Sequence, residues 1–213
     1  MEIMDHRGRQ VTPPVPAGWR LEGGHDQVVV LRGVSWEQYT ALDRAKADQP
    51  RPAIAYLDGE LELVTTSTRH ELVKKLLARL IEAFAEERRL RLDGFGDATV
   101  RNKRRRAGAE PDEWYRITRT SKVPDLVIEV VFTSGGIDKL EVYRRLGVAE
   151  VWCWIDGKIW MYRLVDGAYA EATESRALEG IDLDRLERVI AAADEESDQT
   201  ALVRAYRRSL AKR

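Results

Sequence analysis

The stretch PDLVIEVVFTSGGIDKLEVYRRLGVAEVWCWI, residues 124–155, decides the fold. It opens with an apolar run of strand length, passes a glycine pair into a segment with helical spacing, and closes on a second apolar run. Gly147 is the expected C-cap of that helix. Two strands joined by such a crossover pair in parallel, with a strong right-handed preference. The stretch therefore predicts an α/β core with a mixed sheet.

Two Asp-Gly pairs predict hairpins on either side of this unit. Asp58-Gly59 divides AIAYLDGELELV (residues 53–64), and a second Asp-Gly pair at 156–157 divides EVWCWIDGKIWMYRL (residues 150–164). Asp-Gly between alternating apolar residues is a strong signal for a tight turn. Further strands are expected at residues 27–31, 91–100, 108–117 and 124–132.

Capping boxes mark two helices before the central unit. Ser35 with Gln38 predicts a helix that ends near Ala45, and Thr68 with Glu71 predicts a second one. The second helix carries one apolar stripe at helical spacing, formed by Val73, Leu76, Leu77, Leu80, Ile81 and Phe84.

The chain divides into three expected parts. Residues 1–26 are polar and proline-bearing and predict an extended arm, residues 27–180 form the α/β domain, and residues 181–213 form a helical tail with a break around Asp198. A length of 213 residues suits one such domain with a hydrophobic core of its own.

Composition limits the compartment and the partners. The formal net charge of −1 excludes a globally basic nucleic-acid-binding protein, so any such surface must be local. Cys153 is the only cysteine, which excludes an intramolecular disulfide and favours the reducing cytoplasm. No apolar run resembles a signal peptide or reaches membrane-spanning length, so no membrane association is expected.

Two carboxylates are expected to meet on neighbouring strands. Side chains alternate along a strand, so Glu129 shares a face with Asp125 and Val131, whereas the opposite face is buried under a helix. If strand 108–117 pairs with strand 124–132, Asp112 comes beside Glu129. Two such carboxylates repel each other, and a bound hard divalent cation commonly offsets this repulsion.

Basic groups near these carboxylates favour phosphodiester chemistry. Lys139 and Tyr143 share one face of the helix that follows the strand, and a lysine there can stabilise an anionic phosphate. His70 points with the apolar stripe toward the sheet, where a site role competes with that of a satisfied core histidine. Lys139 has a plain alternative too, as a solvated helix residue paired with Asp138 or Glu141.

The ordered set of motifs between residues 53 and 169 resembles the Uma-type family, described as restriction endonucleases, in the PD-(D/E)XK nuclease superfamily. The matching pieces are YLDGELE (56–62), the His70-Glu71 pair, GAEPDEWY (108–115), PDLVIEV (124–130), DKLEVYRRLGVAEVW (138–152) and the closing Asp-Gly hairpin. The resemblance implies an αβββαβ core, to which the sequence pattern adds an N-terminal hairpin and helix and C-terminal helices.

The resemblance also implies a catalytic set. Asp112 and Glu129 would hold Mg²⁺ or Mn²⁺, water would attack the scissile phosphate, and His70 would assist. The superfamily lysine would fall at Val131, so the resemblance implies that Lys139 supplies it from the following helix.

Three further carboxylates are secondary candidates for the site. Asp125 is alternatively a strand-start hydrogen-bond acceptor, Glu60 a solvent-facing residue beside the turn, and Glu71 part of the helix cap.

DNA is the expected partner. The dense basic run Arg101, Lys103, Arg104, Arg105 and Arg106 is the candidate phosphate-binding surface, although a charge run is often merely solvated. A homodimer is expected for cleavage of both DNA strands. The alternatives are an inactive nuclease fold kept for nucleic-acid binding or assembly, and hydrolysis of RNA or a nucleotide instead of DNA.

Overall fold

The computed structural model describes residues 26–46, 49, 51–133 and 136–211. In chain order the elements are β1 (Gln27–Arg32), α1 (Trp36–Lys46), β2 (Ala53–Leu57), β3 (Glu60–Thr65), α2 (Thr68–Arg88), β4 (Asp93–Gly94), β5 (Val100–Asn102), η1 (Lys103–Arg105), β6 (Ala107–Ala109), β7 (Glu113–Arg116), β8 (Leu126–Val131), α3 (Lys139–Leu146), β9 (Glu150–Ile155), β10 (Lys158–Val165), β11 (Ala168–Ala172), α4 (Leu183–Ala191) and α5 (Gln199–Leu210).

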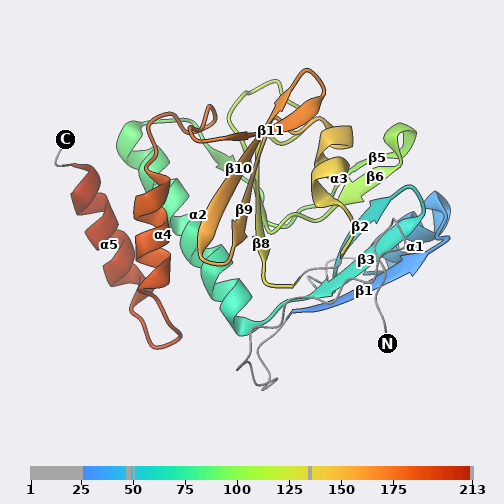
Figure 1. The fold of residues 1–213 in the computed structure, drawn as a ribbon, viewed down its shortest axis with the longest axis horizontal. Coiled ribbons are helices and arrows are strands. Elements are labelled where there is room, and N and C mark those ends of the chain that lie inside the picture. Colours follow the sequence, from blue (N-terminus) through green and yellow to red (C-terminus); the bar gives the residue numbers. More distant parts are fainter. Residues whose placement is uncertain (1–25, 47–48, 50, 134–135, 212–213) are drawn as a thin grey trace.

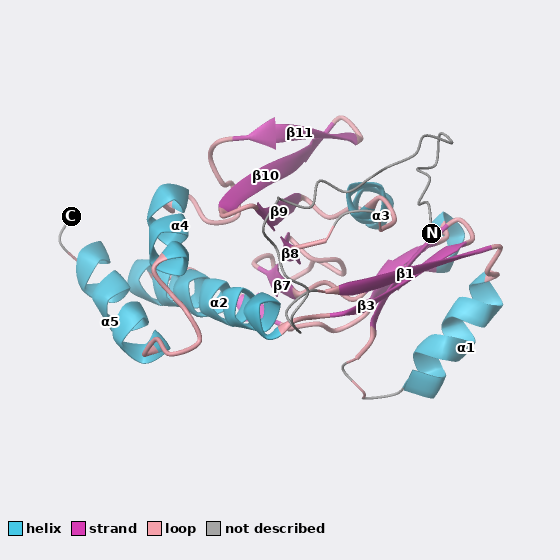
Figure 2. Ribbon diagram, turned by 60° about the horizontal axis from the view of Figure 1, so that its bottom comes forward, coloured by secondary structure: helices cyan, strands magenta, loops and turns pink. Residues whose placement is uncertain are grey.

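The strands form two sheets rather than one. The five-stranded sheet has the order β1-β3-β2-β6-β5, and the six-stranded sheet has the order β11-β10-β9-β8-β7-β4. Helices α2, α4 and α5 lie on one side of the six-stranded sheet, and α3 lies on the other, toward the five-stranded sheet (Figure 1). Figure 2 shows α1 on the far side of the five-stranded sheet.

The six-stranded sheet confirms the expected mixed α/β core. β8 and β9 pair in parallel across the α3 crossover, whereas β7–β8, β4–β7 and β9–β10 are antiparallel. Leu126, Ile128 and Val130 of β8 pack in the same apolar cluster as α2, and Val127 packs with α3, as alternation along a strand requires. Helix α3 ends at Gly147, whose φ of 83° is the left-handed conformation of a glycine C-cap.

The predicted hairpins and the first capping box are also confirmed. β2 pairs with β3 and β9 pairs with β10, each pair turning at an Asp-Gly. Ser35 Oγ accepts from the Gln38 N–H at 3.1 Å, and Gln38 Oε1 accepts from the Ser35 N–H at 2.7 Å. The first helix therefore starts where its sequence predicts.

Two predicted strands are wrong as single elements. Residues 108–117 split into β6 and β7, which belong to different sheets. The Glu110 N–H still bonds to the Ile54 carbonyl, but Pro111 has no N–H to continue the ladder, so the chain crosses between the sheets there. Of residues 91–100, only Asp93–Gly94 (β4) and Val100, the first residue of β5, are strand, and Gly96, with a φ of 59°, lies in the turn between them.

The cap of α2 differs from the prediction by one residue. Ser67, not Thr68, is the N-cap, and its hydroxyl accepts from the His70 N–H at 3.2 Å. The Ser67 N–H is bonded by Asp26 at 2.8 Å rather than by a glutamate of the helix itself. This hydrogen bond joins the start of α2 to Asp26, which lies 41 positions earlier in the chain.

The C-terminal helices pack on the core as the predicted helical tail. α4 and α5 contribute Leu186, Ile190, Val203, Tyr206 and Leu210 to the cluster that α2 forms with the sheet. The predicted break is confirmed, since Asp198 caps α5. Within the described part of the chain, no helix is long and apolar enough to cross a bilayer.

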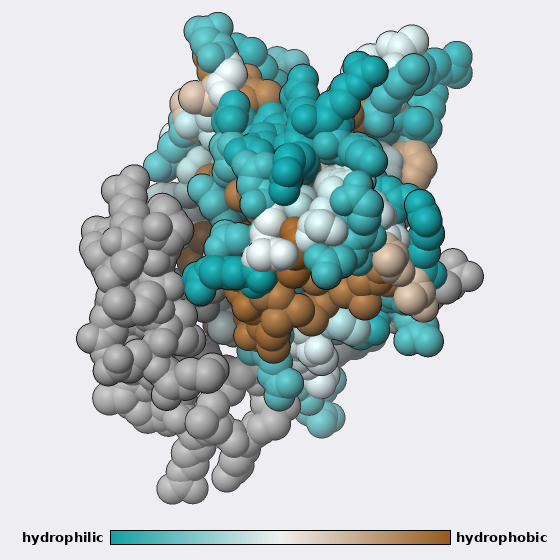
Figure 3. Space-filling view, turned by 90° about the vertical axis from the view of Figure 1, so that its right-hand side faces the viewer, coloured by the Kyte–Doolittle hydropathy of each residue, from teal (hydrophilic) through white to brown (hydrophobic). Residues whose placement is uncertain are grey.

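Figure 3 looks onto the side formed by α1 and the five-stranded sheet, where an apolar area lies among polar residues. β1 is an edge strand of the five-stranded sheet, and on it Val29 is 51% exposed and Leu31 is 45% exposed. The tryptophan-bearing hairpin is mostly core: Trp152 and Trp154 are buried, and Trp160 is exposed.

Candidate active site

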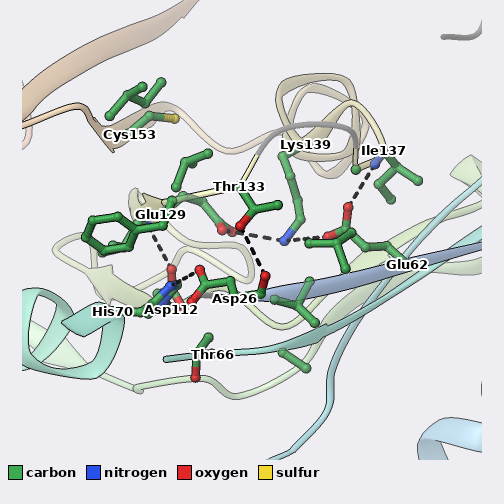
Figure 4. A pocket seen from close by; sticks show the side chains of 18 of the residues that line it. Asp26, Glu62, Thr66, His70, Asp112, Glu129, Thr133, Ile137, Lys139 and Cys153 are labelled. Carbon is green, nitrogen blue, oxygen red and sulfur yellow. Dashed lines mark hydrogen bonds and ion pairs between the residues drawn. The ribbon is translucent and has the colours of Figure 1, made fainter. Parts of the chain in front are cut away.

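A pocket of about 330 Å³ lies between the two sheets beside α3. Figure 4 shows the side chains that reach into it from β3, α2, the β6–β7 connection, β8 and α3. Its ionisable lining is mostly acidic: Asp26, Glu62, His70, Glu110, Asp112, Glu129, Asp138 and Lys139. The pocket therefore carries more acidic than basic side chains.

Asp112 and Glu129 both line this pocket, as the sequence predicts. Glu113 pairs with Ile128, so one further step of the register sets Asp112 opposite Glu129. Asp112 Oδ2 accepts from the Val130 N–H at 2.7 Å, which fixes the β6–β7 connection against β8. Both residues are buried, at 8% and 6% exposure, and Asp112 is one of the groups that raise the pKa of Glu129.

His70 is clamped between two carboxylates. Its Nδ1 lies 2.7 Å from Asp26 Oδ2 and its Nε2 lies 2.8 Å from Asp112 Oδ1. Burial by itself lowers the pKa of His70, but the hydrogen bonds to Asp112 and Asp26 outweigh it and raise the pKa to about 9. The ring is therefore an imidazolium at neutral pH and donates to both acids.

Asp26 is a site residue that the sequence analysis assigned to the N-terminal arm. Its backbone carbonyl accepts from the Thr133 hydroxyl at 3.2 Å, so it also touches the segment after β8. Burial raises the pKa of Asp26, but His70 and the Ser67 N–H bring it below its ordinary value. A single acidic residue before a strand carries no signal for such a role, because its partners lie more than 40 positions away.

Lys139 and Tyr143 both contact Glu129, one helical turn apart on α3. Lys139 Nζ lies 3.5 Å from Glu129 Oε2, and the Tyr143 hydroxyl donates to Glu129 Oε1. Burial raises the pKa of Glu129 and Lys139 opposes this, leaving it well above its ordinary value. Burial lowers the pKa of Lys139, but Glu129, Glu62 and Asp112 outweigh it, so the amine is charged.

Glu62 and Glu110 are the other pocket acids that the sequence analysis missed. Glu62 Oε1 lies 3.3 Å from Lys139 Nζ, and its Oε2 accepts from the Ile137 N–H at 2.8 Å. Glu110 pairs with the half-buried Lys46 at 2.7 Å. The alternation of ELEL in β3 placed Glu60 and Glu62 on one face but did not show which of them α3 covers.

The structure places the three secondary candidates outside the pocket lining. Asp125 Oδ2 accepts from the Ile117 and Thr118 N–H groups at 2.7 and 2.8 Å, which fits the strand-start role. Glu60 pairs with Arg32 at the end of the β1–β3 ladder, at 3.1 Å. Glu71 accepts from the Thr66 hydroxyl at 2.6 Å and pairs with Lys74.

The basic run lies on β5, η1 and the residue after it, and most of its charges have partners. The ion pairs and hydrogen bonds are Arg101 with Asp43, Lys103 with Glu37, Arg106 with Asp58, and Arg105 with the carbonyl of Arg145. Arg104 is exposed and pairs with no acid among the described residues. The surface is thus less basic than its sequence indicates.

The donor set suits a hydrated hard cation better than a cage of protein ligands. Among the described residues no group of three or more histidine, cysteine or acidic side chains has metal-holding geometry. Mg²⁺ commonly keeps several waters and uses one or two carboxylates. The paired, buried carboxylates of Asp112 and Glu129 fit that mode, since each oxygen that accepts one hydrogen bond retains a second lone pair.

Comparison with known proteins gives a family and a fold. The family model "Uma2: Putative restriction endonuclease" matches residues 36–193. No curated protein matches the chain. Among solved structures, one titled "a putative nuclease belonging to DUF820 from Anabaena variabilis" has a TM-score of 0.51 at 12% identity, covering 74% of this chain and 99% of that one. At that identity the likeness establishes a shared fold.

Proposed function

Because this chain belongs to the Uma2 family of restriction endonuclease-like proteins, we propose that it is a metal-dependent endonuclease that hydrolyses DNA phosphodiester bonds. The observation that carries the proposal is the convergence of Asp112, Glu129 and Lys139 on one pocket. Carboxylates that can hold a metal ion, with an adjacent ammonium, are groups that can catalyse phosphodiester hydrolysis.

Asp112 and Glu129 would hold Mg²⁺ or Mn²⁺, which when bound polarises the phosphate and lowers the pKa of a coordinated water. Lys139 offers a fixed positive charge beside Glu129 for the charge that develops on the phosphate. His70 keeps Asp112 oriented, because its imidazolium and the Val130 N–H together use one position on each Asp112 oxygen. Tyr143 orients Glu129 in the same way.

Cleavage assays test this proposal. Supercoiled plasmid, linear duplex, single-stranded DNA and RNA are incubated with Mg²⁺ or Mn²⁺, and with EDTA as the metal-free control. Metal-dependent cleavage of DNA is expected, and its loss in Lys139→Met would assign it to this pocket. No cleavage of any DNA with either metal would overturn the proposal.

One observation favours the alternative of an inactive binding or assembly module. The position of the superfamily lysine holds Val131, and four of the five cations in the basic run are already engaged. DNA binding without cleavage in the same assays would support that alternative. We further propose a cytoplasmic homodimer acting on both strands, and light scattering of the purified protein at assay concentration tests the dimer.

A further inference from the structure

Glu62 differs from the other acids of the pocket because it contacts both the backbone before α3 and the Lys139 side chain. It lies on β3 opposite Ala55 of β2, on the face that packs toward α3, and is 3% exposed. One oxygen accepts from the Ile137 N–H at 2.8 Å, and the other lies 3.3 Å from the Lys139 ammonium. Glu62 thus joins the five-stranded sheet to the start of the helix that carries Lys139.

The segment before α3 is shaped around this carboxylate. A Cβ built on Gly136 would lie 1.9 Å from Glu62 Oε2, so any larger residue at this position would displace the Glu62 carboxylate from its present place. Glycine at this position lets the backbone approach closely enough for the Ile137 N–H to donate. The Ile137 N–H bond to Glu62 therefore depends on glycine at position 136.

The Lys139 ammonium lies between two carboxylates, 3.3 Å from Glu62 Oε1 and 3.5 Å from Glu129 Oε2 (Figure 4). Glu129 is also the residue that faces Asp112 across the strands. A cation held by Asp112 and Glu129 would have the ammonium as its neighbour on the Glu129 side. Two positive charges would then flank a bound phosphate, the arrangement that two-metal sites achieve with two ions.

Resting on the function proposed above, we propose that Glu62 is a positioning residue for Lys139, and that the ammonium it holds fills a second cation position beside Glu129. The wild-type protein then binds one divalent ion, because the second position is occupied by its own lysine. Glu62 and Glu129 together define that position.

Counting bound Mn²⁺ without DNA, by calorimetry and by electron paramagnetic resonance of the free ion, tests this directly. Wild type is expected to bind one ion and Lys139→Ala two, since the shorter side chain opens the position and leaves both carboxylates in place. Adding Glu62→Gln to Lys139→Ala is expected to restore one ion.

Glu187 provides a matched control at a remote place. It too is buried, accepts from a backbone N–H (Ile159, 2.9 Å) and pairs with a lysine (Lys158, 2.6 Å). Adding Glu187→Gln to Lys139→Ala is therefore expected to leave two ions bound.

The single Glu62→Gln variant keeps the proposal testable if Lys139→Ala does not fold. Glutamine can still accept from Ile137, but the ammonium then pairs with Glu129 alone and competes with the metal. Mn²⁺ binding is expected to weaken by about tenfold, the effect typical of groups behind metal ligands. Glu187→Gln should leave it unchanged.

The outcomes separate this inference from the proposed function. No Mn²⁺ binding by wild type would overturn both. Two ions in wild type, one ion in Lys139→Ala, or two in its double variant with Glu62→Gln would overturn only the role of Glu62. An unchanged Mn²⁺ affinity in Glu62→Gln would do the same.

Discussion

His70 Nε2 lies 2.8 Å from Asp112 Oδ1, and this contact joins the start of α2 to the carboxylate of Asp112 in the pocket. The same ring contacts Asp26 on its other side, and Asp26 bonds the Ser67 N–H at the helix cap. One chain of contacts thus links helix capping to the orientation of a proposed metal ligand.

The charge on His70 predicts a pH dependence of stability in metal-free buffer. Its pKa is about 9 in the folded protein against an ordinary 6.5. A raised histidine pKa stabilises the fold fully below pH 6.5, and that contribution is lost as pH rises through 9. We expect denaturant unfolding of wild type to lose up to about 3 kcal/mol over this range. In His70→Gln the free energy of unfolding should decrease less over this pH range. An equally steep decrease in the variant would rule out His70 as its source.

The burial of Glu113 predicts a second pH dependence of stability, in which the fold favours the neutral form of the side chain. It is 8% exposed, its carboxyl group forms no hydrogen bond with another described residue, and burial raises its pKa to about 7. The ionised form is therefore disfavoured in the fold, so stability falls as pH rises from 4.5 through 7. Glu113→Gln should raise the free energy of unfolding by about 1–3 kcal/mol at pH 8.

The same substitution should have little effect at pH 4, where the carboxyl is protonated in both states. Glu113 and Glu86 line one surface hollow, where Glu86 is exposed, so Glu86→Gln serves as the control and should change little at either pH. An equal gain at pH 4 and pH 8 would contradict the ionisation argument.

Two aspartates that follow prolines predict contrasting effects on cleavage. Asp112 lines the pocket, whereas Asp125 bonds two backbone N–H groups outside it. Asp112→Asn should lower the cleavage rate by at least about a hundredfold, as loss of a group that stabilises the transition state does. Asp125→Asn, which can still accept these bonds, should stay within about threefold of wild type. Equal losses in both would mean that the assay reports folding, which thermal melts would reveal.

The basic run predicts different roles for neighbouring arginines. Arg104 has no acidic partner among the described residues, whereas Arg101 pairs with Asp43. If Arg104 contacts a DNA phosphate, Arg104→Ala should reduce the slope of log affinity against log salt by about 1. Arg101→Ala should leave the slope unchanged. Fluorescence anisotropy with labelled duplex in Ca²⁺ measures both, and an unchanged slope for Arg104→Ala would remove it from the interface.

Local signals predicted much of this fold. The Asp-Gly turns, the Ser35–Gln38 box and the crossover that ends at Gly147 all depend on residues close in sequence, and each is confirmed. The division of residues 108–117 between two sheets depends on β2, more than 50 positions earlier, and on Pro111. No pattern within residues 108–117 indicates that β6 pairs with β2.

The same distinction holds for the site. Alternation along β8 and the pairing of neighbouring strands predicted that Asp112 and Glu129 would meet. Asp26 and Glu62 were missed because their contacts with His70 and Lys139 span 44 and 77 positions. The position of Glu62 depends on how α3 covers the other sheet, which is a property of tertiary packing.

Calorimetric titration of Mn²⁺ into the metal-free protein, without nucleic acid, tests most directly whether Asp112 and Glu129 form one metal site. We expect wild type to bind the ion and both Asp112→Asn and Glu129→Gln to lose that binding while melting as folded proteins. Absence of binding in wild type, or undiminished binding in either folded variant, would contradict the assignment.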